Sequence, residues 1–177
     1  MSTRALRAHK TLPAKYYTGQ RIFREEKERF YFDSWICAGR SGQIAGTGDY
    51  FLRELLGECV VITRDAGGMV RAFYNVCRHR GTRICTDPEG AFDGRIQCPY
   101  HGWTYGLDGC LIGAPHMSDS GFSRAEYPLH RVSAEVWDGH IFIQPGKQPP
   151  TTWAPRMRAR RPLTWEARWG SGTAPRS

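Results

Sequence analysis

Two short segments of this chain each carry one cysteine and one histidine, and each ends in a glycine. The first is Cys77-Arg78-His79-Arg80-Gly81, and the second is Cys98-Pro99-Tyr100-His101-Gly102. Glycine suits a tight loop, because it adopts backbone conformations closed to other residues and lets the chain approach a bulky group. We therefore expect a fold that brings two loops together, so that two thiolates and two imidazoles share one centre.

The set Cys77, His79, Cys98 and His101 leaves three interpretations open. A [2Fe–2S] centre with mixed ligands takes two thiolates on one iron and two imidazoles on the other. A structural zinc ion also accepts two Cys and two His, but zinc fingers usually keep the cysteines on one knuckle and the histidines together on a helix. Incidental placement of buried cysteines and hydrogen-bonded histidines is the third interpretation. The mixed pair in each segment favours the iron–sulfur centre.

Length and composition predict one domain with a packed core. The chain has 177 residues, of which 40% are hydrophobic and 12% aromatic, enough for a single interior. No stretch approaches the ~18 consecutive apolar residues of a membrane helix, and residues 1–15 lack the apolar centre of a secretory signal. We therefore expect a cytoplasmic protein without membrane association, in which Cys37, Cys59, Cys85 and Cys110 are ordinary thiols.

The net charge of +8 is unevenly distributed along the chain. Residues 151–177 contain six arginines and one glutamate, or +5, so residues 1–150 carry only +3. A strongly basic protein can bind nucleic acid non-specifically. The near-neutral body, without a Lys/Arg stripe around a recognisable nucleic-acid motif, argues against such a partner.

The residue pattern predicts a mainly β fold, a small antiparallel β-sandwich preceded by one helix. Residues 20–32 are typical of an amphipathic helix that caps a domain, with Thr18 as its N-cap. Glycine turns separate short apolar runs that predict strands, over residues 35–38, 50–55, 59–63, 70–76, 103–105, 109–112, 132–137 and 140–144. Residues 65–68 and 138–139 read as hairpin turns, and residues 86–94 as a turn-rich connection.

These boundaries divide the chain into three parts. Residues 1–33 are an N-terminal segment with the helix, and residues 34–146 are the domain with both Cys/His segments, each on a hairpin tip. Residues 147–177 are a basic tail rich in Arg, Ala, Pro, Gly, Thr and Trp. A composition without a periodic apolar face is typical of a disordered segment; a sequence read out of frame is the other interpretation.

The chain resembles the Rieske [2Fe-2S] domain of aromatic ring-hydroxylating oxygenase large (alpha) subunits over residues 12–146. The resemblance is most specific in residues 77–81 and 98–105, and extends to residues 26–29, 72–76 and 137–143. It implies a Rieske-type β-sandwich with two cluster-binding hairpin loops. It also implies that Cys77, His79, Cys98 and His101 ligate the cluster.

The resemblance further implies one-electron transfer by the N-terminal part of an oxygenase subunit that stops before its catalytic domain. In the family, that later domain holds a mononuclear Fe(II) by two His and one carboxylate. The histidines after His101 are His116, His130 and His140, which are well separated. We therefore expect neither that iron nor a catalytic residue in this chain.

The family implies a ferredoxin or flavin reductase as electron donor and a homo-oligomeric parent enzyme. The alternative function is a stand-alone Rieske ferredoxin-like carrier, although such carriers usually lack the N-terminal helix. Arg78 and Arg80 are either solvated or attract an acidic donor. The substrate of the parent enzyme, an aromatic acid or a quaternary amine, stays open, because its pocket is not in the chain.

The chain departs from the high-potential respiratory branch of the same family. Thr82 and Tyr100 stand where that branch carries a disulfide, and Trp103 stands where it carries a serine. Fewer hydrogen bonds predict a potential toward the lower end of the roughly −150 to +300 mV Rieske range. Tyr100, Trp103 and Tyr105 are expected to pack in the core around the loops.

Overall fold

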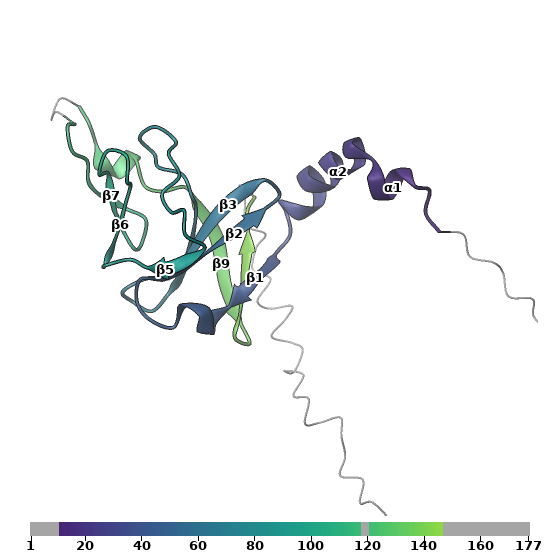
Figure 1. The fold of residues 1–177 in the computed structure, drawn as a ribbon, viewed down its shortest axis with the longest axis horizontal. Coiled ribbons are helices and arrows are strands. Elements are labelled where there is room, and N and C mark those ends of the chain that lie inside the picture. Colours follow the sequence, from purple (N-terminus) through teal and green to yellow (C-terminus); the bar gives the residue numbers. More distant parts are fainter. Residues whose placement is uncertain (1–10, 118–120, 147–177) are drawn as a thin grey trace, which may run out of the picture.

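The computed structural model describes residues 11–117 and 121–146. In these ranges the chain forms a seven-stranded and a three-stranded antiparallel sheet (Figure 1), with strand orders β1-β10-β9-β4-β3-β2-β5 and β6-β7-β8. The strands are β1 (Ile36–Arg40), β2 (Asp49–Leu55), β3 (Glu58–Arg64), β4 (Val70–Tyr74), β5 (Glu89–Ala91), β6 (Arg95–Gln97), β7 (Thr104–Gly106), β8 (Leu111–Gly113), β9 (Arg131–Trp137) and β10 (His140–Gln144). The predicted mainly β fold is confirmed.

The central strands of the large sheet bury both of their faces. Successive side chains of a strand point to opposite faces, and on β3 Val60 and Ile62 enter one core cluster whereas Val61 enters the other. On β4, Ala72 and Phe73 divide in the same way. The two apolar cores therefore lie on opposite faces of β3 and β4: the large sheet curls around one of them and packs against the small sheet across the other.

The core cluster that includes Val61 and Phe73 also contains both cysteines of the Cys/His segments. It joins side chains of the large sheet to those of the small sheet, among them Ile96, Tyr105 and Leu111. Cys77 and Cys98 are each 2% exposed within it. Both thiols therefore lie inside the packed interior.

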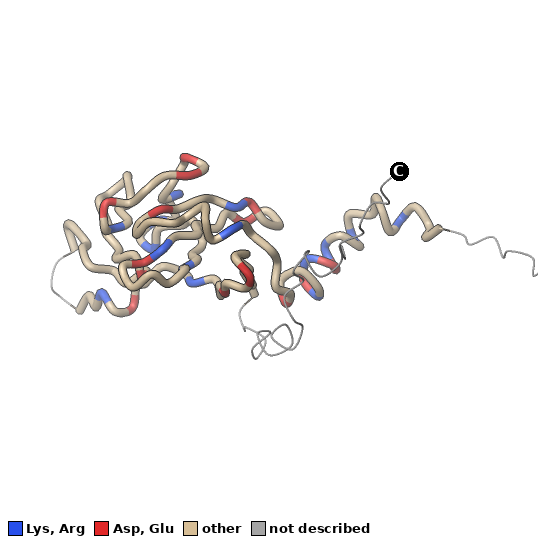
Figure 2. Tube along the Cα trace, turned by 90° about the horizontal axis from the view of Figure 1, so that it is seen from below, with Lys and Arg blue, Asp and Glu red and all other residues tan. Residues whose placement is uncertain are grey.

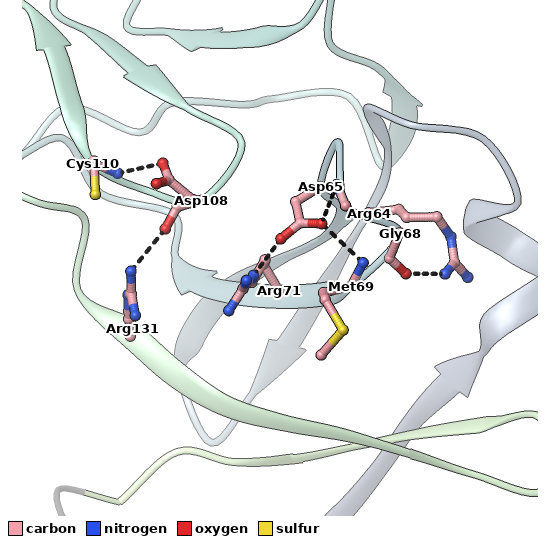
Figure 3. A network of polar contacts seen from close by, with 9 residues as sticks. Arg64, Asp65, Gly68, Met69, Arg71, Asp108, Cys110 and Arg131 are labelled. Carbon is pink, nitrogen blue, oxygen red and sulfur yellow. Dashed lines mark hydrogen bonds and ion pairs between the residues drawn. The ribbon is translucent and has the colours of Figure 1, made fainter.

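The turn between β7 and β8 fastens the small sheet to the large one. The N–H of Leu129 donates to the carbonyl oxygen of Gly109 at 2.8 Å, and Arg131 on β9 donates to the carbonyl oxygen of Asp108 at 3.1 Å (Figure 3). Gly109 has φ +86° and lies against the ring of Phe73, where a Cβ would overlap it. Only glycine combines this conformation with so close a contact.

The predicted hairpin at residues 65–68 is confirmed, and a buried carboxylate holds it. Asp65 Oδ1 accepts hydrogen bonds from the N–H groups of Gly67 and Met69, both at 2.9 Å, and Oδ2 pairs with Arg71 at 2.7 Å (Figure 3). Burial raises the pKa of Asp65, but Arg71 and the two N–H donors outweigh it and leave that pKa below its ordinary value. The turn is thus fixed by an ionised side chain.

The N-terminal helical region differs from the prediction. It comprises α1 (Lys15–Thr18), α2 (Gln20–Glu26) and a π-helical turn (Lys27–Tyr31), and none of their residues is buried. The N-cap of α2 is Gly19 and not Thr18, which is the last residue of α1 and whose hydroxyl donates to the carbonyl oxygen of Ala14. Figure 1 shows α1 and α2 extending away from the sheets, so the helix does not cap the domain.

Charges of both signs are interspersed along this helical region and over the sheets (Figure 2). Within α2, Arg21 and Glu25 form an exposed ion pair at 2.6 Å. No helix in the described ranges is long and apolar enough to span a membrane.

The connection between the Cys/His segments contains two strands that the sequence did not predict. Strand β5 pairs with the edge of β2, from Phe51↔Glu89 to Asp49↔Ala91, and β6 pairs with β7. The residues of β5, Glu-Gly-Ala, are all exposed, so they carry no apolar alternation. This strand forms because the edge of β2 offers free main-chain groups. The predicted tail, residues 147–177, lies outside the described residues.

Candidate metal centre

Both Cys/His segments fold into the same kind of closed turn. In loop 1 (residues 77–82), the N–H of Cys77 donates to the carbonyl oxygen of Thr82 at 2.8 Å, and the N–H of Gly81 donates to that of Cys77 at 3.0 Å. Gly81 has φ +71°, a conformation that costs other residues about 1–2 kcal/mol. The turn therefore explains the glycine at this place.

Loop 2 (residues 98–103) repeats this pattern at the tip of the β6–β7 hairpin. The N–H of Cys98 donates to the carbonyl oxygen of Trp103 at 2.8 Å, the N–H of Gly102 donates to that of Cys98 at 3.1 Å, and Gly102 has φ +70°. The cysteine opens each turn and the glycine sits at the same place in both. The histidine stands two residues after Cys77 but three after Cys98.

The fold brings the predicted ligand residues into contact in two pairs. The rings of His79 and His101 lie edge to face, with centroids 4.6 Å apart. The thiols of Cys77 and Cys98 are near enough to share a hydrogen bond. Within residues 11–117 and 121–146, no three His, Cys, Asp or Glu side chains converge on a single metal ion. The contacts are thus one between the two thiols and one between the two imidazoles.

The surroundings of the sulfurs supply hydrogen-bond donors. Main-chain N–H groups of Tyr100 and His101 donate to the sulfur of Cys98, and the hydroxyl of Tyr105 lies 3.3 Å from Cys77 Sγ. Burial raises the pKa of the Cys98 thiol, although the two N–H groups partly oppose it. A buried thiol of raised pKa stays protonated unless a metal displaces its proton.

The residues fit a [2Fe–2S] group of the Rieske type. His79 Nδ1 is buried and has no hydrogen-bond partner in the structure, and a buried ring nitrogen without a partner is costly unless it binds something. Burial, followed by the neighbouring His101, lowers the pKa of His79, which favours the neutral imidazole that metals need. Two sulfurs and two ring nitrogens are the donor set of such a cluster.

The aromatic residues around the loops divide into two groups. Trp103 and Tyr105 are 1% and 0% exposed, as predicted, and the Trp103 ring stacks on His79 with centroids 4.8 Å apart and planes 8° apart. Tyr100 is 61% exposed and lies beside His101 at 3.8 Å between centroids. The predicted core position of Tyr100 is therefore wrong: the turn points it outward, beside the half-buried His101.

Arg78 makes contacts that the sequence did not reveal. Its Nη1 lies 2.6 Å from His130 Nε2, its Nη2 donates to the carbonyl oxygen of Glu126 at 3.3 Å, and the guanidinium lies over the Tyr127 ring. Burial and the charge of Arg78 lower the pKa of His130. Arg78 thus ties loop 1 to residues 126–130, about 50 positions further along the chain, and is not simply solvated.

The other cysteines do not pair. All six lie in the described part of the chain as free thiols, with Cys85 buried, Cys59 half-buried, and Cys37 and Cys110 exposed. Burial raises the pKa of Cys85 to about 12. These observations agree with ordinary thiols at the four positions outside the candidate centre.

The family of this chain follows from a comparison with known domains. A model of the Rieske [2Fe-2S] domain matches residues 34–133, which include both loops and the large sheet up to β9. The chain belongs to the Rieske [2Fe-2S] domain family. Its cofactor is therefore a Rieske-type cluster, and the domain transfers electrons through it.

Related Rieske domains occur in oxygenase subunits. The carnitine monooxygenase oxygenase subunit of Escherichia coli (strain K12) is 40% identical over 134 residues, 75% of this chain and 36% of that protein. The glycine betaine monooxygenase oxygenase subunit of Pseudomonas aeruginosa (strain UCBPP-PA14) is 36% identical over 140 residues, 79% and 32% of the two chains. The chain thus spans about a third of the length of these curated relatives.

Solved Rieske oxygenases show the same architecture. The quaternary ammonium Rieske monooxygenase CntA in complex with L-carnitine superposes with a TM-score of 0.76 and 33% identity, over 84% of this chain and 44% of that one. Naphthalene 1,2-dioxygenase from Rhodococcus sp. superposes with a TM-score of 0.73 and 29% identity, over 80% and 33%. The Rieske-type fold is therefore established by structure as well as by sequence.

Proposed function

We propose that Cys77 and Cys98 hold one iron of the [2Fe–2S] cluster and that His79 and His101 hold the other. The convergence of the two loops carries this assignment, together with the unpartnered Nδ1 of His79. When bound, such a cluster supplies reversible one-electron transfer. Cys77, Cys98, His79 and His101 would hold it, and Tyr105 and the main-chain N–H groups of loop 2 would donate hydrogen bonds to the cysteine sulfurs.

The two histidines have different access to the surroundings. Both histidines are half-buried, but the buried indole of Trp103 covers one face of His79, whereas His101 lies beside the exposed Tyr100. Electrons cross short distances between a ligand and a partner more readily than long ones, so we assign the exchange surface to the His101 side. A ferredoxin or flavin reductase is the proposed donor.

We propose that the chain corresponds to the Rieske part of an oxygenase large subunit, rather than to a stand-alone carrier. The relatives that support this are oxygenase subunits. In the structural superpositions, an identity of 35% to the quaternary ammonium monooxygenase CntA, against 29% to naphthalene 1,2-dioxygenase, favours a quaternary amine as substrate of the parent enzyme. The oxygenation step is not assigned to the residues described above.

The parent enzyme is proposed to be a homo-oligomer, since one solved quaternary ammonium Rieske monooxygenase is described by its inter-subunit electron transfer. The proposed location is the cytoplasm. The four cysteines outside the candidate centre are free thiols and support this location, because a reducing compartment preserves them.

Metal analysis and spectroscopy of the full chain test the cluster assignment. We expect two irons and two acid-labile sulfides per chain, a red-brown oxidised protein and an electron paramagnetic resonance (EPR) signal after reduction. Cys98→Ser and His101→Ala should lose the cluster, whereas Cys110→Ser, which changes an exposed thiol, should keep it. One zinc per chain without labile sulfide would refute the proposal.

A further inference from the structure

The ends of the two loops are held in different ways. Loop 2 is the tip of a hairpin, and the strands on both sides pair at Gln97↔Thr104. Loop 1 is entered from β4, but the residues by which the chain leaves it, Ile84 and Cys85, belong to no strand. A ladder of main-chain hydrogen bonds therefore does not fix the exit of loop 1.

The side chain of Asn75 takes the place of the missing strand. Its Oδ1 accepts hydrogen bonds from the N–H groups of Ile84 at 3.0 Å and Cys85 at 2.9 Å, and its Nδ2 donates to the carbonyl oxygen of Cys85 at 2.7 Å. A side-chain amide offers the same kinds of donor and acceptor as a peptide group. Asn75 therefore acts as one rung of a sheet between the entry and the exit of the loop.

The same residue anchors this rung to β3. Nδ2 of Asn75 lies 3.4 Å from Cys59 Sγ, and its main-chain N–H donates to the carbonyl oxygen of Cys59 at 2.8 Å. Asn75 is 5% exposed, and Ile84 and Cys85 are each 6% exposed. Buried polar groups that lose their partners are costly, because water cannot replace the lost bonds. The loop ends are thus held in one position.

We propose that Asn75 is a positioning residue for the cluster. It fixes both ends of loop 1, so that Cys77 and His79 already face Cys98 and His101 when iron and sulfide arrive. The inference rests on the proposed function, since it concerns the assembly and retention of the cluster. If Asn75 contributed only to general stability, its variants would lose iron no faster than a control variant that is equally destabilised.

The test compares two variants at this position with a matched control. Asn75→Asp keeps the acceptor at Oδ1 and replaces the donor at Nδ2, and Asn75→Leu removes both. Thr63→Val is the control, because Thr63 is a fully buried residue of β3 whose hydroxyl donates to the carbonyl oxygen of Asp49 at 2.9 Å, away from both loops. Each full-length chain is reconstituted, and its iron, labile sulfide, reduced EPR spectrum, thermal unfolding and rate of iron loss to a chelator are measured.

We expect Asn75→Asp to lose iron at least on the order of tenfold faster than the wild type, because a carboxylate cannot donate the Nδ2 hydrogen bonds to the Cys85 carbonyl oxygen and Cys59 Sγ, and a single buried hydrogen bond is worth about a factor of ten. Asn75→Leu should lose iron faster still, and both variants should show altered EPR spectra. Thr63→Val should unfold at a lower temperature but keep the wild-type spectrum and rate.

Wild-type spectra and rates in both Asn75 variants would overturn the inference. Equal acceleration in Thr63→Val would overturn it too, since iron loss would then follow global stability. If Asn75→Leu does not fold, Asn75→Asp decides alone. A wild-type chain without a [2Fe–2S] cluster refutes the proposed function instead, and this is seen before any variant is compared.

Discussion

The hydrogen bond from Tyr105 to Cys77 should raise the reduction potential of the cluster, and Tyr105→Phe removes it. The phenol oxygen lies 3.3 Å from Cys77 Sγ and accepts a hydrogen bond from the N–H of Arg78 at 3.1 Å. A cluster-bound thiolate has no proton to give, so the hydroxyl donates to sulfur. Burial raises the pKa of Tyr105 far above its ordinary value, which keeps that proton in place.

The size of the effect follows from the charge that reduction adds. Hydrogen bonds to charged groups are worth about 1.5–3 kcal/mol, and we take about 1 kcal/mol as the part that distinguishes the reduced from the oxidised state. For a one-electron couple, 59 mV corresponds to about 1.4 kcal/mol, so Tyr105→Phe should lower the potential by about 40 mV. The unpaired N–H of Arg78 should also lower the thermal unfolding midpoint by several degrees.

A redox titration followed by EPR measures this shift. The matched control is Tyr74→Phe. It also removes a hydroxyl hydrogen bond, in this case to the carbonyl oxygen of Pro145 at 2.7 Å, but it does not change the contacts of the Cys77 and Cys98 sulfurs. The control should keep the wild-type potential. An intact cluster in Tyr105→Phe at the wild-type potential, or a rise in potential, would show that the hydroxyl does not act on the cluster as argued.

Two further predictions concern stability. Gly109→Ala should lower the free energy of unfolding by about 2–4 kcal/mol, measured with denaturant, because of left-handed backbone strain and overlap with the Phe73 ring. Gly68→Ala is the control: Gly68 has φ +80° but open space around it, so the loss should be only about 1–2 kcal/mol. Equal losses in the two variants would contradict the proposed overlap with Phe73. The folded-state pKa of His130 is lowered by burial and by Arg78, so stability should fall as pH drops below about 6.5. His130→Gln should weaken this dependence, and an unchanged pH profile in that variant would rule out His130 as its source.

Several elements of the fold could be predicted from the sequence because their causes are local. The hairpin at Asp138-Gly139 is an example: both residues have positive φ, 48° and 72°, and join Trp137↔His140. Asp-Gly is suited to this turn, and the flanking strands alternate. The closed turns around Cys77 and Cys98 likewise depend on glycines a few residues away.

Other elements could not be predicted, since their partners are distant in the sequence. Strand β5 has no apolar pattern and forms only because β2 offers an edge. The exposed helix shows the opposite case: its apolar residues suggested a covered face, but Phe23 and Phe30 are 49% and 60% exposed. A periodic pattern indicates that a face is apolar, but not which surface, if any, covers it.

The sequence by itself determined the chemistry of the centre, two Cys and two His in glycine-closed loops, and the β character of the chain. Only the tertiary structure decided how these loops are held: by Asn75 across the ends of loop 1, by Tyr105 on Cys77, and by Arg78 on His130. Turn conformation and strand alternation are set by neighbours along the chain. Hydrogen bonds between residues up to 52 positions apart exist only once packing has brought them together.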